Sequence, residues 1–137
     1  MLDHGPAPDP LARRLAALVG SPGEVPAELS YLTRAVLQRN ARNAVVLDLR
    51  QLSDATDYFL IVSGDSDVHA RAIADNALER AREGGIRAAG IEGRSAGRWI
   101  LMDFINVVLH VFLPDVRDFY QLERLWGDAP RASLEDL

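Results

Sequence analysis

The sequence has no cysteine, no lysine and only three histidines, His4, His69 and His110. Without cysteine, the chain forms no disulfides, Cys-ligated zinc sites or thiol nucleophiles. Three scattered histidines do not make a histidine-rich metal site, so we predict neither a bound metal nor a cofactor. All 15 basic residues are arginines, so the lysine of Schiff-base chemistry and of phosphate-binding loops is missing too.

Long hydrophobic runs are also missing. The longest one covers residues 105–113 and is interrupted by Asn106 and His110. A membrane-spanning helix needs about 20 apolar residues, roughly twice this length. The N-terminus lacks the basic stretch and apolar core of an export signal. We therefore expect a cytoplasmic protein with no membrane partner.

Basic residues are outnumbered by acidic ones. The 15 arginines face 20 acidic residues, which gives a net charge of −5 and an isoelectric point near 5.1. Such a chain is repelled by nucleic-acid phosphates, so it does not hold polyanions by bulk electrostatics. The favoured partner is a basic protein, or a basic patch on one, and we expect no direct sequence-specific contact with nucleic acid.

The length of 137 residues and an apolar content of 48% are typical of one domain with its own core. Four of the seven prolines lie in residues 1–25, which predicts a Pro-rich, loosely ordered arm with at most a short helix at 11–19. Residues 128–137 have one arginine, three acids and no apolar periodicity, which predicts a tail. The domain itself is expected to span residues 26–127.

Apolar periodicity predicts eight elements within this domain. One helix follows Pro26 and ends near Asn40. A second follows residues 63–67, with Asp67 as the expected N-cap and two glycines at 84–85 as the stop. Strands are predicted at 44–49, 58–62, 86–91, 99–104 and 107–113, and a closing helix at 119–126. The order α-β-β-α-β-β-β-α predicts a single α/β domain with a mixed five-stranded sheet flanked by helices.

The strand at 99–104 has two different faces, because alternate side chains point to opposite sides of a sheet. Its even-numbered side chains are all apolar and predict a core face. Trp99, Leu101 and Asp103 share the other face, which should be partly wet because an unpaired buried carboxylate is costly. If His110 of the next strand lies beside this face, an apolar patch ringed by Asp103, His110 and Arg98 results. Such a patch is typical of a protein-binding site.

Two simpler interpretations remain open for these residues. A further helix could cover the face and make Trp99 a core residue, since large aromatic side chains are usually well buried. A single histidine on an apolar strand, such as His110, is more often a hydrogen-bonded structural residue than a base or a ligand. Tyr120 can likewise belong to a closing helix that packs on the sheet.

From Tyr31 onward, the order of motifs resembles the ribosomal silencing factor family, also called RsfS or Iojap-like proteins. The most specific pieces are Gly-Arg-Trp at 97–99, Leu-His-Val-Phe at 109–112 and Tyr-x-Leu-Glu-x-Leu-Trp at 120–126. The full set of matching segments is 46–48, 57–59, 62–67, 92–93, 97–103, 107–112 and 119–127.

This resemblance implies a nucleotidyltransferase-like fold and a function without catalysis. It implies binding to the large ribosomal subunit through its fourteenth protein, which obstructs subunit joining and represses translation. Carried over by position, Trp99, Leu101 and Asp103 lie on the strand that the family presents to this partner. His110 and Tyr120 match further motif positions and are expected at the same partner-binding site.

The sequence departs from the family pattern in two places: the Pro-rich arm before Pro26 has no recognised counterpart, and one turn differs. Family members usually join the last two strands with a Gly-Asp pair, whereas this chain has Ile105-Asn106. Asparagine tolerates a positive φ angle, but isoleucine does so poorly.

Two other functions are compatible with the sequence. Asp65, Asp67 and Asp103 could hold two Mg²⁺ ions in a nucleotidyltransferase-like enzyme, although the first two fall in a cap-like loop rather than on a strand. The patch around Trp99 could instead pair with itself in a homodimer that serves as a structural module.

Overall fold

The structure is a computed structural model that describes residues 10–18 and 25–134. Its helices are α1 (Pro10–Leu18), α2 (Ala27–Gln38), α3 (Asp67–Glu83), α4 (Pro114–Tyr120) and α5 (Leu122–Leu125). Its strands are β1 (Arg42–Asp48), β2 (Tyr58–Ser63), β3 (Gly90–Glu92), β4 (Trp99–Asp103), β5 (Val107–Phe112) and β6 (Arg131–Ser133). Among the described residues, no helix has the length and apolarity that crossing a bilayer requires.

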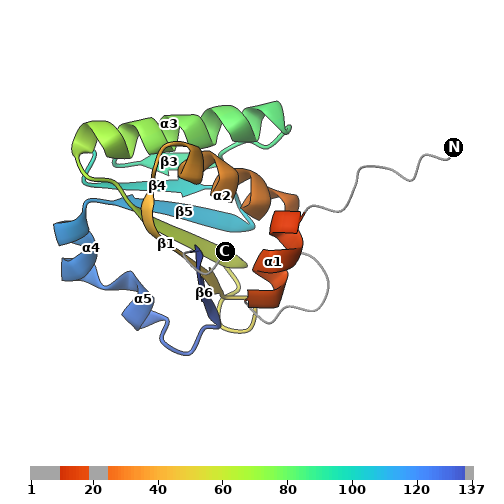
Figure 1. The fold of residues 1–137 in the computed structure, drawn as a ribbon. Coiled ribbons are helices and arrows are strands. Elements are labelled where there is room, and N and C mark those ends of the chain that lie inside the picture. The colour runs from red at the N-terminus through yellow and green to blue at the C-terminus, as the bar shows by residue number, and fades with distance from the viewer. Residues whose placement is uncertain (1–9, 19–24, 135–137) are drawn as a thin grey trace, which may run out of the picture.

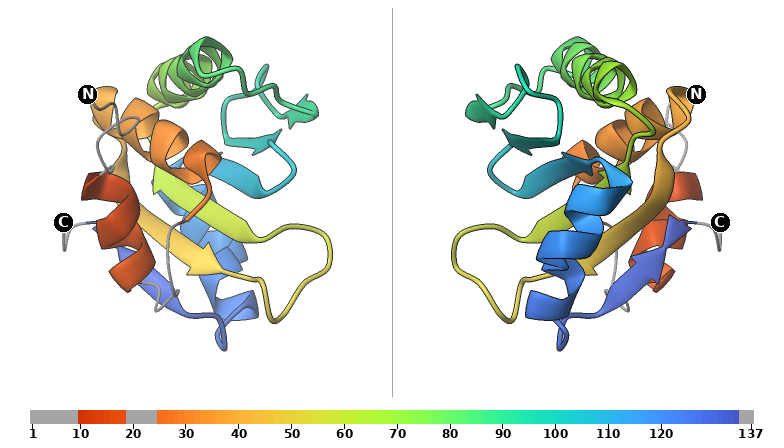
Figure 2. Two further views of the ribbon diagram at one scale, coloured as in Figure 1. Left: turned by 90° about the vertical axis from the view of Figure 1, so that its right-hand side faces the viewer. Right: turned by 90° about the vertical axis from the view of Figure 1, so that its left-hand side faces the viewer.

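The strands form one mixed sheet in the order β3-β4-β5-β2-β1-β6. Only β2 and β5 are parallel, and the other neighbouring pairs are antiparallel. Helices α1, α2 and α3 cover one face of this sheet, and α4 and α5 lie on the other (Figure 1, Figure 2). The predicted α/β class with a mixed sheet between helices is therefore confirmed.

The face under α1, α2 and α3 holds the larger core. Side chains of alternate strand positions, such as Leu60, Ile100 and Leu109, are fully buried there. They meet apolar side chains of the helices, including Leu32 of α2 and Ile73 of α3. Each fully buried side chain of this kind contributes about 1.5–3 kcal/mol, so this face provides most of the stability of the fold.

The sixth strand corrects the predicted tail. Residues 131–133 pair with β1 in antiparallel register, and the neighbouring Ala132 and Leu134 are 4% and 7% exposed. The segment is too short to show a periodicity of its own, and it becomes a strand because the edge of β1 offers unpaired backbone groups.

The helix in the Pro-rich arm is confirmed as α1, but it is not loosely attached. Its Leu15 and Ala16 are 0% and 2% exposed and belong to the larger core. Pro10 stands at the first position of this helix, where proline is favourable because its missing N–H is not needed. The remaining residues of the arm, 1–9 and 19–24, lie outside the described residues.

Two predicted elements differ most from the structure in their bounds. The strand expected at 86–91 is limited to β3, because Ile86 and Ala88 pack against the core instead of pairing with β4. The helix expected at 119–126 begins earlier, at Pro114, and is broken into α4 and α5 at Gln121, whose φ of 47° is left-handed. This break lets Leu122 turn toward the sheet, where it is 9% exposed.

Candidate functional site

The outer side chains of β4 remain half-exposed, as predicted. Trp99, Leu101 and Asp103 are half-buried, whereas the intervening Ile100 and Met102 are 0% and 1% exposed. The outer row continues across the sheet, because Asp103 pairs in register with Val108 of β5, and Val108 with Phe59 of β2. We call these five residues the open face: Trp99, Leu101, Asp103, Val108 and Phe59.

The indole of Trp99 is held between the sheet and α4. Its ring stacks on Phe112 with centroids 4.7 Å apart and tilts against Tyr120 at 4.9 Å. Its Nε1–H donates a hydrogen bond to Nδ1 of His110 over 3.1 Å. These contacts fix the position of the Trp99 ring, and the residue as a whole is half-buried, so part of it remains accessible.

His110 lies under the open face rather than on it. It is 3% exposed, and its ring meets Phe59 edge-on at 4.5 Å. Burial lowers the pKa of His110 to about 4, so the ring is neutral at pH 7 and Nδ1 accepts the Trp99 bond. The structural interpretation of His110 therefore agrees with its position, and its influence on a partner passes through Trp99.

A groove of about 540 Å³ adjoins Trp99. One wall is Tyr120 and Phe119 of α4, which are 50% and 79% exposed, and charged groups of Arg98 and Asp115 lie at its border. Gly93 is also in its lining, and a side chain there would collide with the carbonyl oxygen of Trp99. The groove thus brings together Tyr120 and Trp99, two residues that the family resemblance expects at one partner-binding site.

Several apolar residues of this surface were not predicted. Val108 and Phe59 join the open face through the strand register, which the sequence does not reveal. Phe119 is adjacent to Tyr120 in the chain, but the expected helix at 119–126 did not show that it would face solvent. Its exposure accompanies the helix break at Gln121, a feature of the fold that the apolar spacing of the sequence does not mark.

The three carboxylates of the enzyme hypothesis do not meet. Asp65 follows the C-terminal end of β2, whereas Asp103 aligns with Phe59 near the start of that strand. Six residues of extended chain lie between Phe59 and Asp65, which places Asp65 about 20 Å from the level of Asp103 along the strand direction. Within residues 10–18 and 25–134, no three His, Cys, Asp or Glu side chains gather where they could hold a metal ion.

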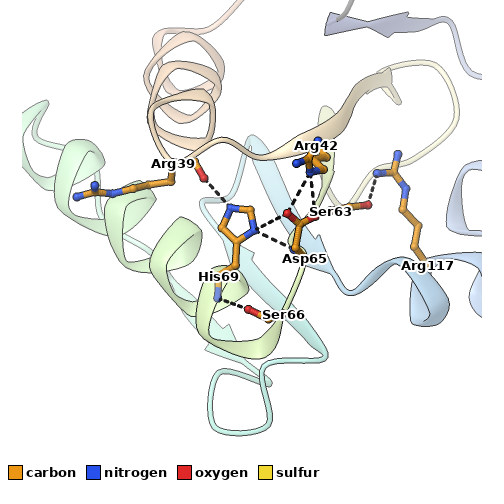
Figure 3. A network of polar contacts seen from close by, with 7 residues as sticks. All are labelled: Arg39, Arg42, Ser63, Asp65, Ser66, His69 and Arg117. Carbon is orange, nitrogen blue, oxygen red and sulfur yellow. Dashed lines mark hydrogen bonds and ion pairs between the residues drawn. The ribbon is translucent and has the colours of Figure 1, made fainter.

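The acids at the start of α3 are engaged in local contacts instead (Figure 3). Asp65 accepts hydrogen bonds from Arg42 at 2.9 and 3.1 Å, and its backbone N–H donates to Nδ1 of His69. His69 in turn bridges to the backbone oxygen of Arg39 over 2.7 Å. These bonds fix the junction between α2, β1 and α3.

The predicted N-cap of α3 is off by one residue. Ser66 is the N-cap, and its hydroxyl accepts a bond from the backbone N–H of His69. Asp67 is the first helical residue, and its carboxylate pairs with Arg71 one turn later at 2.7 Å. This ion pair lowers the pKa of Asp67, and the charge of the carboxylate is compensated within the helix.

Comparisons with known proteins agree with this arrangement. The family model "Ribosomal silencing factor during starvation" matches residues 22–137. A ribosomal silencing factor of Bacillus subtilis is 44% identical over 107 residues, which are 78% of this chain and 91% of that protein. The mouse protein named mitochondrial assembly of ribosomal large subunit protein 1 is 32% identical over 131 residues, 91% of this chain and 58% of that protein. A crystal structure of a Chromobacterium violaceum protein has a TM-score of 0.74 at 31% identity and covers 77% of this chain and 88% of that one. The chain belongs to the ribosomal silencing factor family.

Proposed function

We propose that this protein binds the large ribosomal subunit through its fourteenth protein and thereby keeps the small subunit from joining. The observation that carries the proposal is the open face. Folding has left apolar side chains of a central sheet half-exposed there, although the other face of the same strands is fully covered. Exposed apolar patches of this kind are typical of protein-binding sites.

Charge supports a basic protein as the partner. The chain carries a net charge of −5, and Asp103 in the open face makes no ion pair with a described residue. A carboxylate in this position attracts a basic protein surface and repels RNA phosphates. The name of the mouse relative, which refers to assembly of the large ribosomal subunit, points to the same kind of particle.

The predicted residues take different roles in this proposal. Trp99 and Leu101 supply the apolar contact, and Tyr120 extends it into the adjoining groove. Asp103 sets orientation through its charge. His110 is a positioning residue, because it reaches the partner only through the hydrogen bond that holds the Trp99 ring.

Occupying the surface of the large subunit where the small subunit docks would be sufficient for this function. No bond is made or broken, so neither a cofactor nor a metal is required. The protein would act in the cytoplasm, wherever free large subunits are present, and would lower translation by removing them from the pool that can join.

Co-sedimentation with purified large subunits tests the proposal. The wild-type chain is expected to pellet with free large subunits and not with joined ribosomes. Trp99→Ala should stay in the supernatant, since truncation of a central tryptophan anchor costs about 2 kcal/mol or more of binding, over thirtyfold in affinity.

A matched control shows whether the loss of binding is specific to the open face, and melting curves of both variants show whether they are folded. Tyr31→Ala removes another half-exposed aromatic side chain, on α2 at the opposite side of the sheet, where Tyr31 is 39% exposed. This variant should bind like the wild type. If Trp99→Ala and Tyr31→Ala bind equally well, the open face is not the docking site.

Self-association is the second candidate that the open face favours. Two copies could cover the same apolar residues across a two-fold axis. Sedimentation velocity over a dilution series, with wild type and Leu101→Ala, distinguishes the two uses. A dimer that Leu101→Ala dissociates would place the open face in a homodimer when no ribosome is present.

A further inference from the structure

The turn between β4 and β5 contains an unusual residue. Ile105 has a φ of 75°, in the left-handed region that a β-branched side chain rarely adopts. Asn106, which tolerates such a φ better, is not the residue that adopts it. A non-glycine residue in this region is typically strained, so the surrounding structure must enforce the conformation.

Backbone hydrogen bonds close this turn, among them the N–H of Asn106 to the carbonyl oxygen of Phe104 over 3.0 Å, and side chains add further bonds. The backbone N–H of Ile105 donates to Oδ1 of Asp103 over 2.8 Å, and the Thr56 hydroxyl donates to the carbonyl oxygen of Ile105 over 2.9 Å. The side chain of Asn106 donates to Oε2 of Glu28 over 3.2 Å. The turn is therefore bonded to its own strand, to Thr56 and to α2, which holds the backbone of Ile105 in this conformation.

The side chain of Ile105 contributes little to the stability of the fold. That side chain is 63% exposed, so burial within the protein does not offset the strain. Glycine or asparagine would fit the same backbone with less strain. Stored strain of this sort is found mainly at functional sites, which makes the exposed apolar side chain itself the feature to explain.

The surroundings of Ile105 are acidic. Asp103 and Glu28 bond to the turn, and the backbone N–H of Asp57 donates to the carbonyl oxygen of Asn106. Neither Asp103 nor Glu28 forms an ion pair with a described residue, whereas the charge of Asp57 also acts on the Arg50 guanidinium. An apolar side chain beside the carboxylates of Asp103 and Glu28 suits a basic protein surface with an apolar recess, and these charges repel RNA.

The turn is also continuous with the open face. Ile105 lies two residues beyond Asp103, so it stands at the end of β4 opposite to Trp99. Six residues of extended chain place the two side chains about 20 Å apart. One protein–protein interface of ordinary size, about 800 Å² on each partner, reaches both.

We propose that Ile105 is a second anchor for the protein that docks on the open face and inserts into an apolar recess on its basic surface. This inference rests on the proposed function, because it takes the partner to be a protein of the large ribosomal subunit. It adds a contact point that extends the interface from the strand to the turn.

Ile105→Gly and Ile105→Asn test the inference, because strain and binding should respond in opposite directions. Both variants are expected to keep the wild-type melting temperature or exceed it, since both relieve the left-handed isoleucine. Both should bind purified large subunits roughly tenfold or more weakly, because the buried apolar side chain is lost. Melting curves and a co-sedimentation titration measure the two effects.

Val68→Ala is the matched control. Val68 is a β-branched residue of α3 that is 67% exposed, and its removal should leave the affinity unchanged. If the wild type binds and the Ile105 variants bind within twofold of it, Ile105 is no anchor and the proposed function stands. Melting temperatures well below that of the wild type in both variants would also overturn the inference, because the side chain would then serve the fold. Failure of the wild type to bind would refute the proposed function itself, and with it the partner assumed here.

Discussion

The two faces of the sheet are built from the same strands but are covered to different extents. Under α1, α2 and α3, side chains such as Ile100 and Leu109 are fully buried. On the opposite face, α4 and α5 cover the part around Leu47, Ile61 and Phe112 and leave the open face half-exposed. Since burial on one face already supports the fold, the apolar residues of the open face are available for a partner.

Two adjacent residues of β4 provide the strongest test of this contrast. Ile100→Ala should lower the free energy of unfolding by about 2–5 kcal/mol, because it opens a cavity in a fully packed core. Leu101→Ala should lower the free energy of unfolding by about 1 kcal/mol or less, since the Leu101 side chain is half-exposed and its removal leaves no enclosed cavity. Urea unfolding of both variants measures the difference.

The same pair should give the reverse order in binding. Leu101→Ala is expected to weaken co-sedimentation with large subunits more than Ile100→Ala does, provided that both proteins are folded at the assay temperature. Equal losses of stability in the two variants would mean that the open face is a second core, and the contrast between the faces would fail.

Acid should act on the open side of the sheet through His110. Its pKa is lowered from 6.5 to about 4 by burial, while in the unfolded chain it returns to its ordinary value. Between pH 6.5 and pH 4 the unfolded chain therefore binds a proton that the folded chain does not. The free energy of unfolding should fall as the pH falls through this range, by up to about 3 kcal/mol.

His110→Gln isolates this contribution, because glutamine does not titrate. The variant is expected to be less stable than the wild type at pH 7, but its stability should fall less between pH 7 and pH 4. Denaturant titrations at several pH values give the two slopes. Parallel pH profiles would mean that His110 does not set the acid sensitivity.

Local patterns in the sequence were sufficient for much of the fold. Alternation along 99–104 separated the covered side of β4 from its open side, and helical spacing identified α2 and α3. Strand β6 could not be found in this way, because three residues show no period and their pairing with β1 depends on tertiary structure. The break at Gln121 was missed for a similar reason: a left-handed residue between two turns of helix leaves the apolar spacing almost unchanged.

The sequence could indicate which strands carry Trp99 and His110, but not the contacts that these residues make. The sequence placed Trp99 and His110 on neighbouring strands, but not the 3.1 Å hydrogen bond that makes His110 a support for the indole. It also offered Asp65, Asp67 and Asp103 as a carboxylate set. The pairing of β4, β5 and β2 places Asp103 level with the start of β2, whereas Asp65 and Asp67 follow the end of β2. This pairing is a long-range contact that local sequence patterns do not show.

The smallest expected effect concerns the charge of the open face. Asp103→Asn keeps an oxygen that can accept the bond from the N–H of Ile105, so the turn and the stability should be nearly unchanged. If a basic protein docks here, the variant should bind large subunits several-fold more weakly at low salt, and the difference should shrink as salt screens the pair. Glu79→Gln makes the same change of charge at an exposed position of α3, on the covered side, and should have no such effect. A loss of affinity that is equal in both variants would reflect net charge alone, whereas a loss confined to Asp103→Asn would locate the attraction at the open face.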